Sequence, residues 1–340
     1  MGVLLYVGAE PIMTFMRAEG ELKQMAADYL KVYAICSPIS TMTFAADNFL
    51  RICGKLKMSM LLNIFNSLLT IVLEFICLFI LDMPVWGAAL ASCTAMISCV
   101  VIAMTPLAMG KLSLRFCRPH FTRGLLRQIV SSGSPTFLSN AAARITNIVM
   151  NMALIHMGGP AAVTIFGVVM YGGDLIQPII YGVCDSMQPA IGYNHGAGNV
   201  VRVKRFERYV LIASAAVSAL SLVVMMGIPE LVASLFLQPH ELDLLERSAH
   251  AIRLYSLSFV TRWFGFSIQS LFTALDKPLP ATVLSVGNAL VFPMISIAAL
   301  WSLGLDGLWL NFPVTSALVA LTAGLLLLLL RKTLFCPRKE

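Results

Sequence analysis

Charged side chains are scarce in this sequence: Asp, Glu, Lys and Arg together make up 12% of its 340 residues. In soluble globular domains the share is about 25%. Hydrophobic residues make up 58%, and the mean hydropathy is +0.83. The low charge therefore excludes an ordinary soluble domain, and most of the chain must face lipid or other helices.

Motifs for metal binding and catalysis are also lacking. The eight cysteines include no CxxC pair, so neither a zinc site nor a disulfide framework is indicated. The five histidines are scattered over loops and helix ends, and no HExxH, GxSxG or paired acid motif occurs. We therefore predict no catalytic residue, no metal and no cofactor, and we expect a protein that is not an enzyme.

Apolar runs of membrane-spanning length are abundant and recur along the whole chain. Residues 1–16 look like the end of a further span. The predicted spans are 28–50, 58–81, 86–109, 125–157, 161–194, 206–228, 249–275, 279–303 and 307–330.

Basic residues collect in alternate loops between these spans, whereas the 238–247 loop is mostly acidic. Positively charged loops stay in the cytoplasm, so we expect a multi-pass protein of the plasma membrane with a cytoplasmic C-terminus. The net charge of +7 is thus a topology signal and does not indicate nucleic-acid binding. The residues on this side are Arg51, Lys55, Lys57, Lys111, Arg115, Arg118, Arg123, Arg127, Arg202, Lys204, Arg205, Arg208, Lys277, Arg331, Lys332, Arg338 and Lys339.

The chain contains an internal repeat. Residues 27–33 (ADYLKVY) align with residues 249–255 (AHAIRLY) at an offset of 222, which also pairs Lys55 with Lys277. A duplicated hydrophobic bundle creates a pseudo-symmetric interface in the bilayer, where transporters bind their cargo. The predicted fold is an all-α integral membrane protein of two pseudo-symmetric helical bundles.

A basic segment with Pro119 interrupts the hydrophobicity for longer than any other loop. We predict a cytoplasmic linker at 111–124, a partial N-terminal lobe at 1–110 and a six-helix C-terminal lobe at 125–340. A symmetric protein would carry about a hundred further residues before Met1, given the offset of 222. We therefore expect an N-terminally truncated transporter; the alternative is a degraded first lobe.

Several segments carry a family resemblance. Residues 188–198 (QPAIGYNHGAG), followed by Arg202, resemble the end of the eighth helix in the multidrug and toxic compound extrusion (MATE) family. Residues 132–135 (SGSP) look like the start of its seventh helix, and residues 48–51 (NFLR) are similar to its turn between helices four and five. The resemblance covers nearly the whole chain, from the end of helix three to helix twelve, with about nine complete transmembrane helices.

This resemblance implies a secondary antiporter that works by alternating access and exports amphipathic or cationic compounds in exchange for H⁺ or Na⁺. Family members often use acidic residues of the first helix for cation coupling, and that helix is not represented here. Some relatives carry a glutamate in the seventh helix. The corresponding span here contains Arg144 and no acid, so coupling through that position is not expected, and we take Asp174 as the candidate in its place.

Ionisable residues inside spans are candidates for function because burying them in a bilayer is costly. Arg144 and Asp174 each lie 15 residues from Gly159, and an antiparallel hairpin places them at matching depth. They form a structural ion pair, or Asp174 takes a proton or Na⁺ with Arg144 as the counter-charge. Both alternatives remain open from the sequence.

A polar stripe follows the same helix: Tyr171, Asp174, Gln177, Tyr181 and Asp185. Such a stripe must face protein or water rather than lipid. Carboxylates and aromatic faces bind organic cations, which predicts a pathway for cationic drugs. Alternatively, Asp185 simply meets water near the cytoplasmic end.

Four further features are ambiguous from the sequence alone. Asp47 and Arg51 are four residues apart and can form an ion pair. Glu74 faces a cavity or turns outward to the surface. Arg262 holds an acidic group or reaches into the cavity. Pro178, one turn after Asp174, is the predicted hinge for alternating access.

Three functions compete with drug export. A lipid-linked saccharide flippase of the same superfamily would carry anionic cargo and should need several cationic side chains in its cavity. An inert transporter fragment is a second possibility, and a membrane-embedded enzyme lacks its motifs. The expected partners are small-molecule drugs or organic cations and the lipid bilayer, with no nucleic acid, and the protein is expected to be a monomer.

Overall fold

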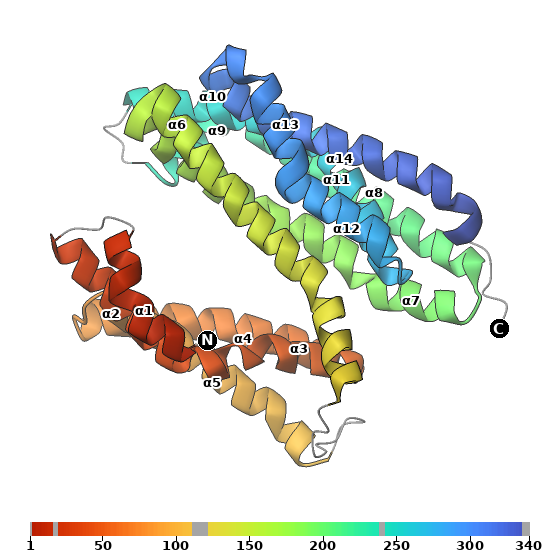
Figure 1. The fold of residues 1–340 in the computed structure, drawn as a ribbon, viewed down its shortest axis with the longest axis horizontal. Coiled ribbons are helices and arrows are strands. Elements are labelled where there is room, and N and C mark those ends of the chain that lie inside the picture. Colours follow the sequence, from red (N-terminus) through yellow and green to blue (C-terminus); the bar gives the residue numbers. More distant parts are fainter. Residues whose placement is uncertain (1, 16–19, 111–121, 238–241, 335–340) are drawn as a thin grey trace. The chain divides into compact units, whose positions relative to one another are not determined.

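The computed structural model describes residues 2–15, 20–110, 122–237 and 242–334 (Figure 1). All regular elements in these ranges are helices. The chain divides into two compact units, Met1–His120 (unit 1) and Phe121–Glu340 (unit 2). The predicted all-α membrane fold is confirmed, while the predicted linker at 111–124 lies largely outside the described residues.

Unit 1 is built around α5, which packs against α2, α3 and α4. The predicted span at 28–50 is divided at Thr41, just after Pro38 in the last turn of α2. Proline lacks an amide hydrogen and weakens the helix around it. The elements of unit 1 are α1 (Gly2–Phe15), α2 (Gly20–Ser40), α3 (Met42–Ile52), α4 (Leu56–Phe75), the π-helical turn η1 (Ile76–Ile80) and α5 (Trp86–Ala108).

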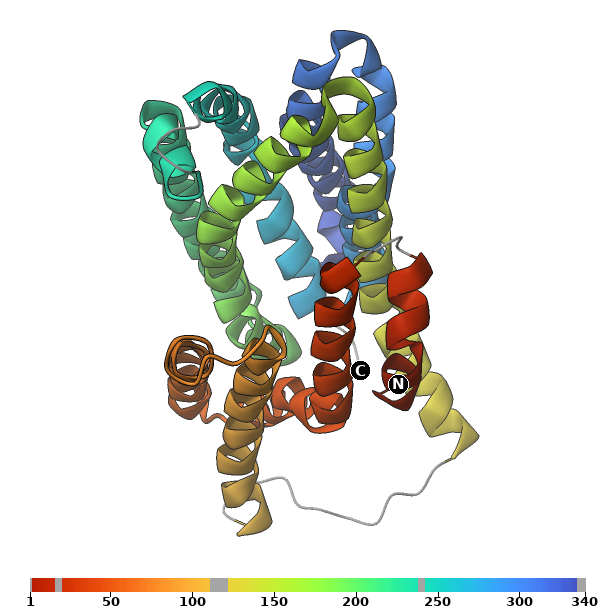
Figure 2. The same cartoon turned by 90° about the vertical axis from the view of Figure 1, so that its left-hand side faces the viewer.

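Unit 2 begins with α6 (Arg123–Ser186), whose two arms meet at a sharp bend (Figure 2). Gly159 at the bend has φ 65° and ψ −163°, a conformation that essentially only glycine adopts. The predicted spans at 125–157 and 161–194 are therefore two arms of one bent helix. The remaining elements are α7 (Gln188–Gly196), α8 (Val200–Gly227), α9 (Pro229–Ser234), α10 (Leu242–Ser256), α11 (Phe259–Ala274), α12 (Pro278–Val286), η2 (Gly287–Val291), α13 (Phe292–Ala299), η3 (Trp301–Leu303) and α14 (Leu305–Leu334).

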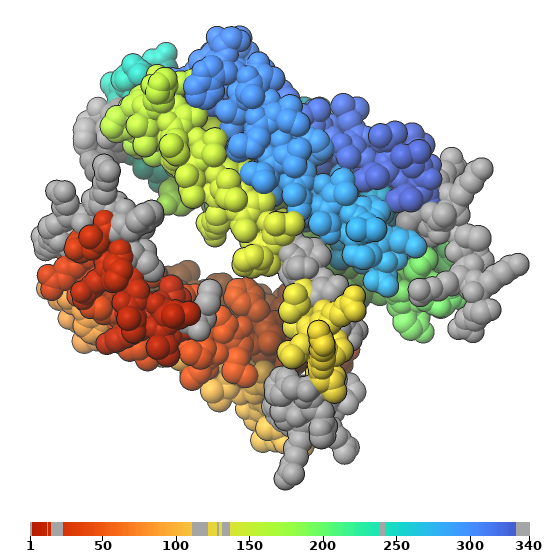
Figure 3. All heavy atoms as spheres, viewed as in Figure 1, coloured from red at the N-terminus to blue at the C-terminus, as the bar shows by residue number. Residues whose placement is uncertain are grey.

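The helices of unit 2 pack around α11, which contacts α8 on one side and α14 on another. The first arm of α6 lies along α12 and η2, seen as yellow-green beside blue in Figure 3. Two apolar clusters fill the interior. One contains Leu154, Val169 and Tyr255, and the other contains Ile268 and Phe272.

Six stretches in the described ranges are long and apolar enough to cross a membrane. Many large apolar side chains on them point outward, for example Phe79 (75% exposed) and Leu328 (70% exposed). An outward-facing apolar surface is what lipid requires of a spanning helix. The stretches are Leu56–Ile80, Trp86–Ala108, Phe137–Gly196, Val200–Gly227, Pro278–Ala299 and Leu305–Leu330.

The turn between α3 and α4 has the same backbone geometry as the turn between α11 and α12. Gly54 (φ 73°) and Asp276 (φ 54°) are both left-handed, and they are related by the offset of 222. In each turn the next amide, that of Lys55 or Lys277, bonds the carbonyl five residues earlier, at 2.8 and 2.9 Å. Both helices thus end in a Schellman motif. The local geometry agrees with the duplication predicted from the sequence.

One buried acid in unit 2 has no partner among the described residues. Glu207 of α8 is 7% exposed, and neither of its carboxyl oxygens makes a hydrogen bond there. Its helix neighbours Val203 and Val210 are buried apolar residues. A buried polar group without a partner loses its hydration and gains nothing in return.

The substitution Glu207→Leu is therefore expected to stabilise the protein by about 1–3 kcal/mol, since the cost of an unsatisfied buried group is removed. The measurement is the midpoint of thermal unfolding in detergent, which should rise. Glu230→Leu is the matched control, because Glu230 is half-exposed and bonded to Arg253 at 2.5 Å, so no gain is expected. A lower midpoint for Glu207→Leu would show that the carboxyl group has a stabilising partner.

Candidate functional site

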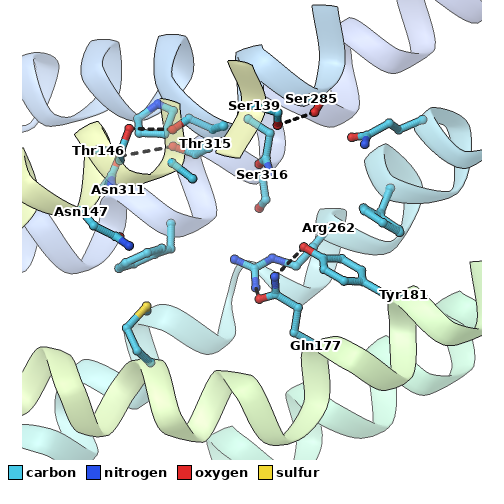
Figure 4. A pocket seen from close by; sticks show the side chains of 18 of the residues that line it. Ser139, Thr146, Asn147, Gln177, Tyr181, Arg262, Ser285, Asn311, Thr315 and Ser316 are labelled. Atoms are coloured by element: carbon cyan, nitrogen blue, oxygen red, sulfur yellow. Dashed lines mark hydrogen bonds between the residues drawn. The ribbon is translucent and has the colours of Figure 1, made fainter. Parts of the chain in front are cut away.

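Unit 2 contains a cavity of about 480 Å³ between both arms of α6, α11, η2 and α14 (Figure 4). This volume lies in the range of small-molecule binding sites. Among the described lining residues Arg262 is the single charged one, and most of the others are neutral and polar. The neutral polar lining residues are Ser139, Asn140, Thr146, Asn147, Gln177, Tyr181, Tyr255, Gln269, Ser285, Asn288, Asn311, Thr315 and Ser316.

Arg262 projects from α11 toward Gln177 of α6 (Figure 4). A second neutral group, the hydroxyl of Tyr255 on α10, also holds it. Its Nη1 donates to Gln177 Oε1 at 3.1 Å and to the Tyr255 hydroxyl at 2.8 Å. The guanidinium carbon also lies 5.2 Å from the ring centre of Tyr255 and 5.6 Å from that of Phe259. Cation–π contacts of this length add attraction without neutralising the charge.

Gln177 is fixed at both ends of its amide. Its oxygen accepts from Arg262, and its Nε2 donates to the Tyr181 hydroxyl at 2.5 Å. The Tyr181 ring in turn stacks on Phe266 with 3.9 Å between ring centres. The chain of contacts therefore fixes the orientation of the guanidinium.

The facing wall of the cavity is formed by hydroxyl and amide groups of the first arm of α6 and of η2 and α14. Ser139 Oγ and Ser285 Oγ are 2.6 Å apart, and Thr146 donates to a backbone carbonyl of η2 at 2.6 Å. Ser139, Thr146 and their neighbours share one face because they recur at i, i+4 and i+7 spacing. This wall can bond a polar ligand without adding charge.

Three of the predicted site residues meet in this cavity: Gln177, Tyr181 and Arg262. Tyr171 does not line it; this side chain is 62% exposed and stacks on Phe236 at 5.8 Å. Asp174 is exposed as well and is not among the lining residues, although it precedes Gln177 by one turn. The predicted stripe is thus divided between the cavity and the surface of α6.

The structure does not contain an ion pair between Arg144 and Asp174, which was one of the two alternatives that the sequence left open. Both side chains are described and exposed, and no salt bridge joins them. Arg144 follows the lining residue Ala143, and one residue step rotates a helix by about 100°. Arg144 therefore lies on a different face of its arm from the residues that line the cavity.

The remaining predicted site residues have local roles. Asp185 Oδ1 accepts from Gln188 at 2.7 Å and from Ser270 at 3.2 Å, which joins the end of α6 to α7 and α11. Glu74 in unit 1 accepts from Ser92 of α5 at 2.7 Å. The predicted hinge Pro178 lies in the second arm of α6 with helical backbone angles, so its role stays a prediction.

The predicted ion pair of Asp47 and Arg51 is confirmed, with 2.8 Å between Oδ2 and Nη2. Asp47 Oδ1 also accepts from Ser59 and, at 3.0 Å, from Asn63 of α4. The carboxylate thereby connects α3 to α4 across the left-handed turn. This arrangement is structural.

The neutral polar residues of the cavity, notably Asn147, Asn288 and Asn311, were not predicted from the sequence. A single amide in an apolar run is less conspicuous than a charged residue there. Their signal was present, because polar side chains in a span must face protein or water. Tyr255 was noted only as a member of the internal repeat.

The bent α6, the cavity within a helical unit and the membrane-spanning stretches define a multi-pass membrane transporter. The model of the MatE family matches residues 1–76 and 135–297, which is more than half of the chain. The chain therefore belongs to the MATE family of transporters, as the motifs predicted.

The chain is 25% identical to the multidrug export protein MepA of Staphylococcus aureus (strain MSSA476) over 338 residues, which cover 98% of the chain and 73% of that protein. It is 24% identical to MepA of Staphylococcus saprophyticus, with 97% and 73% covered.

Solved structures share the fold. An outward-facing multidrug resistance MATE family transporter of the MOP superfamily matches with a TM-score of 0.87 at 23% identity, covering 98% of this chain and 76% of that one. A MOP superfamily transporter from Pyrococcus furiosus, for which reverse polarity of the binding pocket suggests a different function, matches with a TM-score of 0.88 at 21% identity, covering 100% and 77%.

Gly173 of α6 packs closely against Tyr255 of α10. A Cβ added to Gly173 would overlap the hydroxyl of Tyr255, a buried residue with little room to move. Gly173→Ala is expected to lower stability by about 1–3 kcal/mol, because it displaces the hydroxyl that accepts from Arg262. Gly167→Ala on the same arm is the control, since its Cβ meets open space. Equal thermal-unfolding midpoints for the two variants would contradict the packing described.

Proposed function

We propose that this MATE family member is a secondary active exporter of amphipathic, drug-sized molecules, exchanging them for H⁺ or Na⁺ by alternating access. The observation that carries the proposal is the polar cavity of about 480 Å³ inside unit 2. A cavity of this size accepts one drug-sized molecule. The multidrug export proteins to which the chain is similar support this function.

Alternating access requires helices that bend or rock. In this proposal residues 1–110 and 125–340 are the two lobes, joined by the segment at 111–124. Pro178 serves as a hinge, because it lies in α6 directly after the cavity residue Gln177. A proline within a span frees a backbone carbonyl and lowers the cost of bending.

Asp174 is the proposed coupling group. Its carboxylate is exposed, lies one turn before Gln177 and has no ion pair among the described residues. Coupling by competition needs an acid that is free to bind and release a cation. A carboxylate binds and releases both H⁺ and Na⁺, so either ion fits this role.

The proposed location is the plasma membrane, with the basic loops and the C-terminus in the cytoplasm and the protein acting as a monomer. The distribution of Lys and Arg supports this topology.

Flipping of lipid-linked saccharides is the weaker candidate. A lipid-linked diphosphate carries several negative charges and would require several cationic side chains around it. Among the described lining residues Arg262 is the single cationic side chain, because Arg144 lies outside the cavity. A single guanidinium suits a smaller cargo.

Asp174→Asn is expected to abolish gradient-driven transport, because the amide cannot take up or release a cation. The measurement uses vesicles containing the full chain, with an imposed pH or sodium gradient and the dyes rhodamine 123 and rhodamine 110 as cargo. The control is Asp243→Asn, an exposed carboxylate on α10 that pairs within its own helix. Unchanged transport by Asp174→Asn would remove Asp174 from the mechanism, and no transport by the unmodified chain would refute the export function.

A further inference from the structure

We propose that Arg262 is a carboxylate-binding site, and that the cargo of unit 2 consists of molecules bearing a carboxylate on an aromatic or polar body. This inference rests on the proposed export function and names its substrate class. It differs from the organic cations that the sequence pattern predicts.

The charge of the cavity is the first reason. Within the described part of the chain Arg262 bonds Gln177 and Tyr255, which are both neutral, and no acid occurs among the described lining residues. Unlike charges attract and like charges repel most strongly where water is partly excluded. The cavity therefore repels a cation placed at Arg262 and attracts an anion there.

The carboxylates that could have reversed this polarity are elsewhere. Asp185 is engaged by Gln188 and Ser270, and Glu207 is buried in α8 away from the cavity lining. Asp174 is exposed and outside the lining. The positive charge of Arg262 thus remains available to a ligand.

The geometry of Arg262 is the second reason. A guanidinium has five N–H donors, and two bonds from Nη1 are present within the described part of the chain. The remaining donors on Nε and Nη2 form the planar fork that binds both oxygens of a carboxylate. Because Gln177 and Tyr181 already fix the group, little ordering is needed when a ligand binds.

The rest of the cavity fits the body of such a molecule. Phe266, Tyr181 and Phe312 offer aromatic faces, and Asn147 and Asn288 offer amides without charge. The volume of about 480 Å³ accommodates a drug-sized molecule. Size and charge together favour a compact carboxylate over a polyanion.

Rhodamine 110 and rhodamine 123 test the proposal, because they share one ring system and differ in a free carboxylate against its methyl ester. Binding to the purified full chain is measured by fluorescence anisotropy, and export is measured in the vesicles described above. The unmodified chain is expected to bind rhodamine 110 about tenfold more tightly than the ester. Arg262→Gln should remove this preference, and Arg262→Lys should restore part of it.

Two controls distinguish the loss of the Arg262 charge from a general loss of folding as the cause of weaker rhodamine 110 binding. Arg253→Gln removes an arginine of α10 that pairs with Glu230 outside the cavity, so the preference should persist. Each variant must elute as a single species and keep its thermal-unfolding midpoint for its result to count, and Arg262→Lys provides a conservative second variant.

The outcomes distinguish this inference from the export function. Equal binding of the two dyes by the unmodified chain, or an unchanged preference in Arg262→Gln, would overturn the carboxylate site even if both dyes are exported. A preference that depends on Arg262 supports the site even if neither dye moves along a gradient, in which case export alone is refuted.

Discussion

The contact of the Arg262 guanidinium with Gln177 and Tyr255 is the interaction on which the cavity depends. It joins three helices, because Gln177 belongs to α6, Tyr255 to α10 and Arg262 to α11. A partly buried charge with neutral partners is costly unless hydrogen bonds hold it. Here the amide, the hydroxyl and two aromatic rings hold it, and the charge remains open to the cavity.

The bend at Gly159 brings the two walls of the cavity together. It lets residues 139–147 and residues 170–181 face the same space from the two arms of α6. Only a glycine adopts this backbone conformation at low cost. The geometry of a single residue thus determines which side chains can meet a ligand.

Much of the fold followed from the sequence. Hydropathy located the long apolar helices, since lipid demands long apolar runs, and the left-handed residues Gly54 and Asp276 agree with the predicted offset of 222. The i, i+4 spacing was enough for the ion pair of Asp47 and Arg51, because both lie on one regular helix.

The candidate site was predictable only in part. Counting residues from the turn predicts the depth of a side chain on each arm. Which faces of the two arms meet depends on the bend between them. Arg144 and Asp174 lie on faces that do not meet, and they form no ion pair. Arg262 was recognised because charge is rare in a span. Its partners were not recognised, because a tyrosine hydroxyl and an amide come into contact with Arg262 only when the three helices pack together.

The carboxylate site at Arg262 is tested most directly by a structure of the full chain with 4-iodobenzoate, whose iodine and carboxylate can be located separately. We expect the ligand in the cavity of unit 2, with both carboxylate oxygens at hydrogen-bonding distance from Arg262 and the iodine near the wall formed by α6 and η2. A ligand bound elsewhere, or bound with its carboxylate turned away from Arg262, would contradict it.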